Sequence, residues 1–149
     1  MTRPRILPAL IDVNVALPLL IPQHVAHRTA RDWIDAYSRT EIFWAWPTQL
    51  GVLRLLSQPR LMGSGAMLPE QALDSWDRLT AAAGMQQIRK IPPDHAQHLS
   101  RLVRGRAASL NIWTDAWLAA LALSLDLEMA TFDRGFGSFT GLKLRLLQS

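Results

Sequence analysis

Three aspartates stand at points of the sequence where a carboxylate could do chemistry. Asp12 ends the apolar run ILPALID, Asp133 follows EMATF, and Asp115 lies in the largely apolar segment NIWTDAWLAALALSLDL. A buried carboxylate without a partner is costly, and two of them about 4 Å apart repel by roughly 4 kcal/mol at an effective dielectric of 20. A divalent cation reverses that sign. Three converging aspartates would therefore make an oxygen-rich site suited to Mg²⁺ or Mn²⁺.

Two of these aspartates also have ordinary structural interpretations. An aspartate between a strand and a helix caps the helix by accepting hydrogen bonds from free backbone N–H groups, and Asp12 fits that role. Asp133 lies in TFDRGFGSF, where two nearby glycines favour a turn. Asp115 is harder to explain in this way. Its neighbours along the expected helix are mostly apolar, so its carboxylate should point inward or to a rim.

Apolar runs and helical periodicity divide the chain into alternating strands and helices. Short apolar, β-branched or aromatic runs predict strands at residues 6–12, 41–46, 85–91, 128–132 and 142–147. Helical spacing of apolar residues, with prolines and glycines at the segment ends, predicts helices at residues 13–21, 24–39, 47–59, 64–84, 92–107 and 111–127. The last helix is apolar almost all round, which is typical of a helix packed on several sides.

The alternation of strands and helices predicts the fold class. Parallel strands joined by right-handed crossovers give an α/β fold with a central, mostly parallel sheet and helices on both faces. No repeat, linker or low-complexity tract interrupts the chain, so we expect a single domain over residues 1–149. Ligands of such sheets bind in the crevice beyond the carboxyl ends of the strands. Asp12 and Asp133 each follow such an end, which is compatible with their meeting at one site.

Composition and charge restrict the classes of protein that remain. Apolar residues make up 49% of the chain and charged residues 19%, which excludes a disordered protein. The absence of cysteine excludes a disulfide scaffold, an iron–sulfur cluster and a thiolate zinc site. The formal charge is +4, and the basic residues are almost all arginine, whose planar donors suit phosphate.

The N-terminal stretch imitates a targeting segment. MTRPRILPALIDVNVALPLLIP has the basic and apolar parts of a signal peptide, but Asp12, Asn14 and several prolines interrupt it, and no small-residue cleavage site follows. The stretch is also too short and too polar in its middle to span a bilayer. We therefore expect a cytoplasmic protein that does not bind membranes.

Four stretches of the sequence resemble the ordered motifs of PIN domains. They are LIDVNV, TDAWLAALAL, TFDRGFGSFTGLKLRLL and the middle stretch PTQLGVLRLLSQPRLMG, which is similar to one branch of the VapC-type toxins. The resemblance runs from about Leu10 to Leu147. It implies a three-layer PIN-like α/β fold, an acidic pocket that holds Mg²⁺ or Mn²⁺, and endonucleolytic cleavage of RNA, often tRNA or ribosomal RNA. It also implies the toxin role of a toxin–antitoxin pair, with inhibition by a cognate VapB-type antitoxin.

The resemblance also assigns roles to individual residues. Asp12 matches the first motif acid, Asp115 the helix acid and Asp133 the final acid, and all three would be catalytic and metal-binding residues. Our hypothesis is that Asp12 and Asp115 bind the principal metal, while Asp133 binds it through water or helps to hold a second one. Asn14 matches a commonly polar position of the first motif and would contact substrate.

One residue departs from the family pattern. Many PIN domains carry a glutamate on the helix after the second strand, whereas this chain has Gln49, which keeps a carbonyl oxygen but loses the charge. The site would then have fewer carboxylates and could hold one metal instead of two. We expect Gln49 to position a water molecule or a phosphate oxygen. Arg54 on the same helix and Arg134 beside the final acid would contact flanking phosphates.

Two other functions stay open. The first is a binding module with the same fold, which holds RNA or an antitoxin without cutting, and Gln49 favours it. The second is a phosphatase with Asp12 as nucleophile. Those enzymes usually need a second aspartate two residues on, where this chain has Asn14, and a late lysine, for which neither Lys90 nor Lys143 is well placed.

Aromatic and apolar residues outside these motifs suggest packing and partners. Trp113 and Trp117 share one helical face and are expected in the core, while Trp46 could be core or rim. His95 and the histidine three residues later lack a third zinc ligand and are interpreted as solvent-facing. We also expect a homodimer. Apolar residues in the segment 61–68 would contact either the second copy or the antitoxin.

Overall fold

Short runs of buried, mostly apolar residues form a five-stranded sheet in the computed structural model, which describes residues 7–37 and 41–148. The strands are β1 (Ala9–Ile11), β2 (Ile42–Trp44), β3 (Gln86–Gln87), β4 (Glu128–Thr131) and β5 (Leu144–Leu146). Their order across the sheet is β3-β2-β1-β4-β5, and every neighbouring pair is parallel. The expected parallel sheet is therefore confirmed, with strands shorter than the apolar runs that predicted them.

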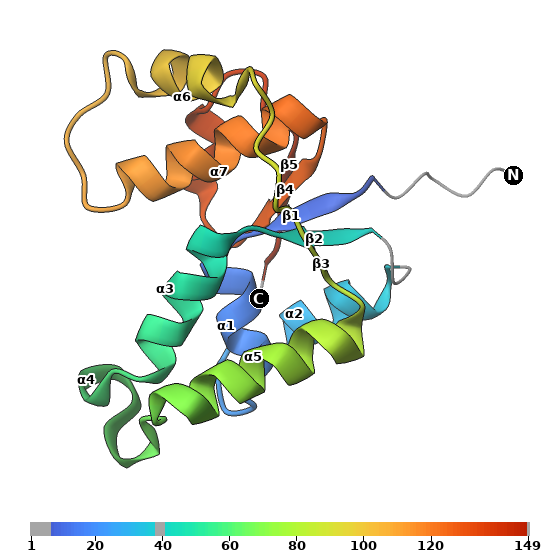
Figure 1. The fold of residues 1–149 in the computed structure, drawn as a ribbon, viewed down its shortest axis with the longest axis vertical. Helices are drawn as coiled ribbons and strands as arrows, with labels where there is room; N and C mark the ends of the chain where they lie inside the picture. Colours follow the sequence, from blue (N-terminus) through green and yellow to red (C-terminus); the bar gives the residue numbers. More distant parts are fainter. Residues whose placement is uncertain (1–6, 38–40, 149) are drawn as a thin grey trace, which may run out of the picture.

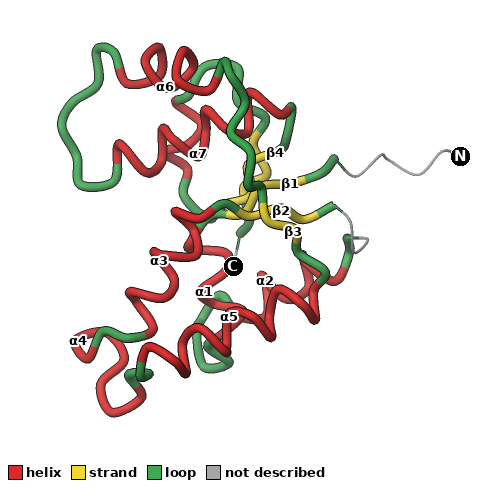
Figure 2. Tube along the Cα trace, in the orientation of Figure 1, coloured by secondary structure: helices red, strands yellow, loops and turns green. Residues whose placement is uncertain are grey.

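Helices cover both faces of the sheet (Figure 1). They are α1 (Val13–Leu20), α2 (His27–Asp35), α3 (Trp46–Leu56), α4 (Pro59–Met62), α5 (Pro69–Ala83), α6 (His95–Val103) and α7 (Ile112–Leu125), with short 3₁₀ turns η1 (Gly63–Gly65) and η2 (Arg134–Ser138). Figure 2 shows α6 and α7 on one side of the strands and α1, α2, α3 and α5 on the other. The three-layer α/β architecture predicted from the sequence is confirmed. None of the helices in the described part of the chain is both long enough and apolar enough to cross a bilayer.

Strand residues alternate between two apolar cores. Ile11 and Ala130 pack with α1, α2, α3 and α5, whereas Leu10 and Met129 pack with α6 and α7. This alternation follows from the two-residue period of a strand, and a sheet covered on both faces needs apolar residues on both. The long apolar helix α7 has a buried run from Leu118 to Ala122, as its all-round apolar sequence predicted.

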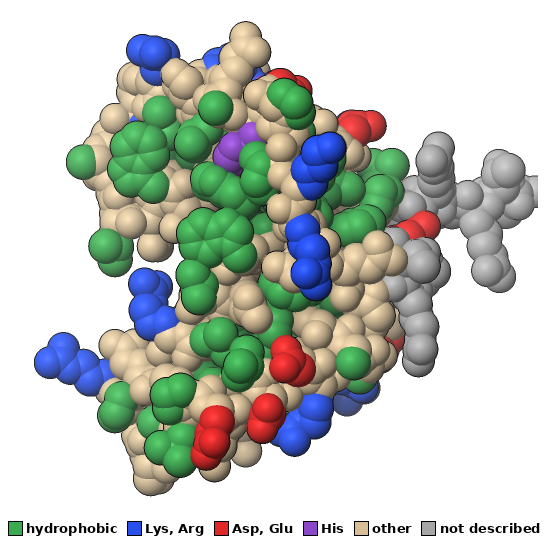
Figure 3. All heavy atoms as spheres, viewed as in Figure 1, with side chains coloured by type: hydrophobic (Ala, Val, Ile, Leu, Met, Phe, Trp, Pro, Cys, Tyr) green, Lys and Arg blue, Asp and Glu red, His purple; other side chains and the backbone are tan. Residues whose placement is uncertain are grey.

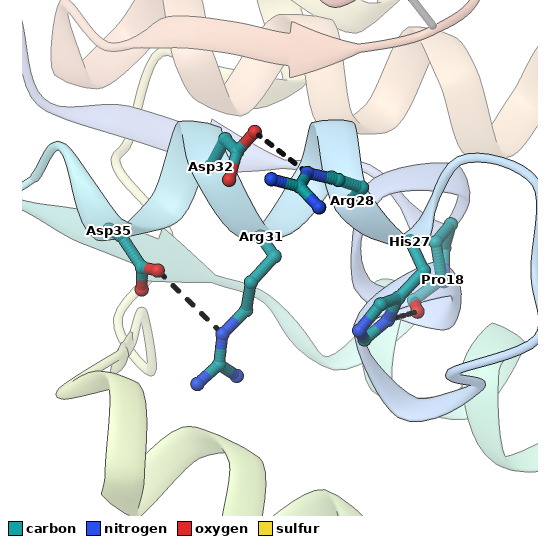
Figure 4. Close-up of polar contacts among 6 residues, drawn as sticks. All are labelled: Pro18, His27, Arg28, Arg31, Asp32 and Asp35. Atoms are coloured by element: carbon teal, nitrogen blue, oxygen red, sulfur yellow. Dashed lines mark hydrogen bonds and ion pairs between the residues drawn. The ribbon is translucent and has the colours of Figure 1, made fainter.

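The helix expected at residues 24–39 begins later than predicted, at His27, and ends earlier, at Asp35, while Arg39 itself lies outside the described residues. The His27 Nδ1 donates to the Pro18 carbonyl over 2.7 Å, which ties α2 to the end of α1 (Figure 4). The buried face of α2 carries Ala30 and Ile34. Its outer face carries two exposed ion pairs, Arg28–Asp32 at 3.9 Å and Arg31–Asp35 at 3.7 Å. Exposed pairs of this kind contribute only about 0.3–0.5 kcal/mol each, so apolar packing holds the helix.

The strand order places a topological switch point at the middle of the sheet. From β1 the chain goes to β2 and β3 on one side, and then to β4 and β5 on the other. The carboxyl ends of β1 and β4 are therefore neighbours whose following segments leave in different directions, which opens a crevice between them. The beginning of α3, directly after β2, lies at the same edge.

A glycine lets α3 approach α1 closely beside this crevice. A Cβ built on Gly51 would lie 2.7 Å from the Val13 Cγ2, closer than real side chains come. Gly51 is inside a helix, where glycine costs up to about 1 kcal/mol relative to alanine. The close contact between α1 and α3, rather than helix propensity, therefore explains why position 51 is a glycine.

The Gly51–Val13 contact predicts that Gly51→Ala changes the free energy of unfolding in opposite directions in two backgrounds of a double-mutant cycle. Gly51→Ala should lower the free energy of unfolding by about 1–2 kcal/mol, because overpacking outweighs the gain in helix propensity. In a Val13→Ala background the same substitution should raise it by up to about 1 kcal/mol, since the clash is gone. Urea unfolding of the four proteins measures both effects. An equal effect of Gly51→Ala in the two backgrounds would contradict the contact.

Candidate active site

The three aspartates meet at the carboxyl edge of the sheet. Asp12 directly follows β1, Asp133 lies two residues after β4, and Asp115 is in the first turn of α7. A helix that leads into a parallel strand runs against it, so α7 begins at the edge where the strands end. All three side chains line one cavity of about 860 Å³. The sequence was compatible with a convergence of the three aspartates, and the structure places all three in one cavity.

Asp12 is the best-fixed of the three acids. Its side chain is 7% exposed, and its two oxygens accept from the Val13 backbone N–H at 2.7 Å and from the Thr131 hydroxyl at 2.9 Å. The carboxylate thus caps α1 and lines the cavity at the same time. Asp133 behaves similarly, because its Oδ1 accepts from the Gly135 N–H at 2.8 Å at the start of η2. The structural interpretations and the site interpretation of these aspartates are compatible.

Thr131 connects the residues around Asp12. Its side chain is fully buried at the end of β4. The hydroxyl has one proton, which it donates to Asp12, and its lone pairs accept from the Asp133 backbone N–H at 3.0 Å and the Asn14 Nδ2 at 3.1 Å. The Asn14 Oδ1 in turn accepts from the Phe132 N–H at 3.1 Å. This network fixes the ends of β1 and β4 relative to one another.

Burial, with a smaller contribution from neighbouring charges, raises the pKa of two of the acids. Burial raises the pKa of Asp12 to about 6, against the hydrogen bonds from Thr131 and Val13 that lower it, and the charge of Asp133 raises it further. Burial also raises the pKa of Asp115 to about 7, with added repulsion from Asp12 and Asp133. The cavity therefore favours either protons or a cation at these oxygens.

The donors that line the cavity fit a hard divalent ion. The three carboxylates and Asn14 offer oxygen ligands, the class preferred by Mg²⁺ and Mn²⁺. Over residues 7–37 and 41–148, however, no three His, Cys, Asp or Glu side chains are already gathered as a metal-ligand set. Because Asp12 is fixed by its hydrogen bonds, a bound ion would have to draw Asp115 and Asp133 inward or reach them through water.

The other residues singled out in the sequence divide into two groups. Asn14 and Arg54 line the cavity, and the Arg54 side chain is exposed, so a cationic group stands in the same cavity as the acids. Gln49 and Arg134 do not line the cavity, although Gln49 is on α3 and Arg134 follows Asp133. The structure thus adds no amide oxygen from Gln49 to the three carboxylates.

Sequence reasoning missed two buried threonines at this edge. Besides Thr131, the Thr48 hydroxyl donates to the Ile11 carbonyl over 3.1 Å, which ties the first turn of α3 to the end of β1. A sequence signal for these threonines exists. Small hydroxyl residues end or follow buried strands, as Thr131 does two residues before Asp133.

Three expectations about aromatic and histidine side chains need correction or completion. Trp113 is not in the core but 64% exposed, because the first turn of α7 extends beyond the layer that covers the rest of the helix. His95 is not solvent-facing but buried, and its Nε2 donates to the Trp117 carbonyl over 2.9 Å. Trp46, which could have been core or rim, begins α3 and is 49% exposed.

Removing the Thr131 hydroxyl tests the network around Asp12. Thr131→Val keeps the shape but removes the partner of the Asp12 Oδ2, the Asn14 Nδ2 and the Asp133 N–H, so the free energy of unfolding should fall by about 1–3 kcal/mol. Thr131→Ser keeps the hydroxyl and should lose less. Denaturant unfolding of both variants measures the difference. Equal stability of the valine and serine variants would show that the hydroxyl does not matter.

The raised pKa of Asp115 makes the metal-free protein less stable at high pH. The native state binds this proton more tightly than the unfolded state, so stability is lost as pH rises from about 4 through the folded pKa near 7. Asp115→Asn should therefore raise the melting temperature at pH 8 by about 2–4 °C, which corresponds to about 1 kcal/mol after discounting for the partial exposure of the carboxyl.

The same substitution should have a smaller effect at pH 5, where the native carboxyl is already protonated. Thermal unfolding in EDTA at both pH values measures the two differences. If Asp115→Asn changed the melting temperature equally at pH 5 and pH 8, the pKa of Asp115 would not be raised.

Comparisons with known proteins show the family to which the sequence is similar. The model of the PIN domain family matches residues 9–142. Ribonuclease VapC41 of Mycobacterium tuberculosis is 33% identical over 143 residues, covering 93% of this chain and 97% of the relative, and ribonuclease VapC44 of the same organism is 37% identical over 130 residues, covering 85% and 86%.

Solved structures show the same fold. The sarcin-ricin-loop-cleaving toxin VapC20 of Mycobacterium tuberculosis aligns with a TM-score of 0.66 at 16% identity, over 92% of this chain and 98% of that one. A chain of VapBC-1 from nontypeable Haemophilus influenzae aligns with a TM-score of 0.66 at 16% identity, over 93% and 96%. The match to the family model over most of the chain and the identity to the curated relatives lead to one conclusion: this chain belongs to the PIN-domain family.

Proposed function

We propose that this chain is a metal-dependent endoribonuclease that acts as the toxin of a type II toxin–antitoxin pair. The observation that carries the proposal is the meeting of Asp12, Asp115 and Asp133 in one cavity at the switch point of the sheet. Relatives of similar length that are named ribonuclease VapC support the substrate class. The domain would be a single one that spans residues 1–149.

The three acids would share the work unequally. A bound Mg²⁺ or Mn²⁺ would lower the pKa of a water molecule and neutralise charge on the scissile phosphate. Asp12, held by Thr131 and Val13, supplies a ligand of fixed direction. Asp115 would lose its proton when an ion is held, because burial and negative neighbours raise its pKa and a cation offsets both. Asp133 is exposed at the rim and would adjust to the ion directly or through water.

The substrate would be held by groups beside the acids. RNA is a polyanion and would be repelled by the carboxylates alone, so cationic contacts must offset that repulsion. Arg54 lines the cavity and has the planar donors that suit a phosphate. Asn14 is largely occupied by its hydrogen bonds to Thr131 and Phe132 and would position the site more than bind substrate. We propose RNA, with tRNA or ribosomal RNA as the class to test first.

A partner and a compartment follow from the same proposal. Several similar folds were solved as toxin–antitoxin complexes, among them VapBC2 of Rickettsia felis bound to a DNA fragment from the promoter. We propose that a VapB-type antitoxin covers the cavity of this chain in the cytoplasm. Leu61 and Leu68 are each more than half exposed in the α4–α5 segment, where a homodimer or antitoxin contact was predicted. The homodimer stays a prediction.

The second candidate is a module of the same fold that binds RNA or antitoxin without cutting. The observation in its favour is Gln49, which stands where many PIN domains carry a glutamate and does not line the cavity. A site with three carboxylates would then bind a metal weakly. Measurement of cleavage at several Mn²⁺ concentrations separates this candidate from the nuclease.

Asparagine substitutions test the catalytic assignment. Asp12→Asn and Asp115→Asn keep the size of the side chain but remove a charged ligand, so RNA cleavage with Mn²⁺ should fall by about 100-fold or more. Asp74→Asn, on the exposed face of α5, is the matched control and should cut like the parent. The assay follows the decay of total tRNA and ribosomal RNA on denaturing gels, with EDTA as the metal-free reference.

The melting temperature of the same four proteins measures metal binding separately from cleavage. Mn²⁺ should raise the melting temperature of the parent and of Asp74→Asn, and should raise that of the two site variants much less. Parent-like cleavage by Asp12→Asn and Asp115→Asn would overturn the assignment. A parent that binds Mn²⁺ but leaves both RNAs intact would favour the non-cutting module.

A further inference from the structure

The exposed tryptophans beside the acids form a second feature of the cavity. We propose that Trp113 and Trp46 bind an unpaired base of the RNA next to the scissile phosphate, so that the phosphate lies at the metal ion held by the acids and the base lies on an aromatic wall formed by the two tryptophans. This inference rests on the proposed ribonuclease function. It adds a base-binding role that the acidic residues do not supply.

The two rings lie at the same sheet edge as the acids. Trp113 is in the first turn of α7, two residues before Asp115, and Trp46 begins α3 directly after β2. Both side chains line the cavity that also contains Asp12 and Asp115. Figure 3 shows apolar side chains on both sides of the hollow between α3 and α7. Large aromatic side chains usually bury most of their surface, so exposure of two of them at one cavity needs an explanation.

A buried histidine holds part of this wall in place. The Trp46 and Trp117 rings meet edge to face with centroids 6.0 Å apart, and the His95 ring packs on Trp117 at 4.7 Å. Because a carbonyl only accepts, the His95 Nε2 must carry the proton that it donates to the Trp117 carbonyl. Trp117 is thereby fixed from behind, and Trp46 has a rigid neighbour. A wall that is already ordered loses less entropy when a ligand binds.

The chemistry of the surroundings favours a nucleotide as the occupant. Binding of single-stranded nucleic acid combines aromatic rings for the bases with cationic groups for the phosphates. Arg54 supplies the cationic group in this cavity, and the tryptophans supply the rings. If the scissile phosphate lies at the metal ion that the acids would hold, a flanking nucleotide lies in the same cavity, where its base can contact the aromatic wall. In a duplex, stacked neighbours cover both faces of a base. The base that binds to the tryptophans must therefore be unpaired and unstacked.

Binding of a short RNA tests the aromatic wall directly. The probe is a fluorescein-labelled single strand of about 12 nucleotides of mixed sequence, measured by anisotropy in EDTA so that it is not cut. Trp113→Ala and Trp46→Ala should each weaken binding by about tenfold, the order expected for loss of one base–aromatic stack. Trp113→Phe keeps a ring and should recover most of the affinity. Leu110→Ala is the matched control, because Leu110 is 97% exposed just before α7 and does not line the cavity.

An abasic scan separates stacking from general packing. One nucleotide at a time is replaced by its abasic analogue in the same probe, and each probe is bound to the parent and to Trp113→Ala. At one position the missing base should weaken binding to the parent by about tenfold and should cost the variant almost nothing. In Mn²⁺, Trp113→Ala should also raise the KM for cleavage of RNA more than it lowers kcat.

Two results would overturn the base-binding role. One is binding of the probe by Trp113→Ala and Trp46→Ala as tight as by Leu110→Ala, which is also the result expected if the rings serve only a protein partner. The other is an abasic penalty that is the same in the parent and in Trp113→Ala. If the proposed ribonuclease function is wrong, the pattern is different. The parent would then leave RNA intact in Mn²⁺, while the tryptophan variants would still bind the probe more weakly than the parent.

Discussion

The burial of carboxylates that also repel one another is the physical constraint on which this edge of the molecule depends. Burial and mutual charge raise the pKa of Asp12 to about 6 and that of Asp115 to about 7. An ionised carboxylate buried without a partner is costly, and neighbouring negative charges add to that cost. The fold meets this cost with two apolar cores, one on each face of the sheet, and keeps Asp133 at the solvent-exposed rim.

The parallel sheet provides a floor that does not yield to that repulsion. Asp12 and Thr131 come from segments 119 residues apart, yet they are joined by a single hydrogen bond across the neighbouring strands β1 and β4. Thr48 adds a second connection by donating to the Ile11 carbonyl at the end of β1. Because these bonds are made at strand ends, they fix the floor of the cavity, whereas Asp115 lies on a helix and Asp133 lies at the exposed rim, where its Oδ1 accepts from the Gly135 N–H.

The sequence was a good guide to elements and a poor guide to side-chain environments. Apolar runs located the strands that precede Asp12 and Asp133, and the apolar length of α7 located Asp115, because burial leaves a periodic record in the chain. The bond between Thr131 and Asp12 leaves no such record, since it joins segments far apart in sequence. Helical periodicity placed Trp113 in the core with Trp117. It failed because a first turn that projects beyond its neighbours has no layer to pack against.

The charges of the chain explain why binding and chemistry should be located on different surfaces of one cavity. The acids that would hold the metal ion repel a polyanion, so they cannot also supply the affinity for RNA. Part of the twelve acidic residues is gathered at this site, and the remaining surface is more basic than the net charge of +4 indicates. Arg54 and the exposed tryptophans line the same cavity, where their attraction for RNA leaves the charge of the acids in place. Under the proposed function, affinity from the walls would be independent of the metal, whereas cleavage would need both, so the protein could hold RNA before an ion completes the site.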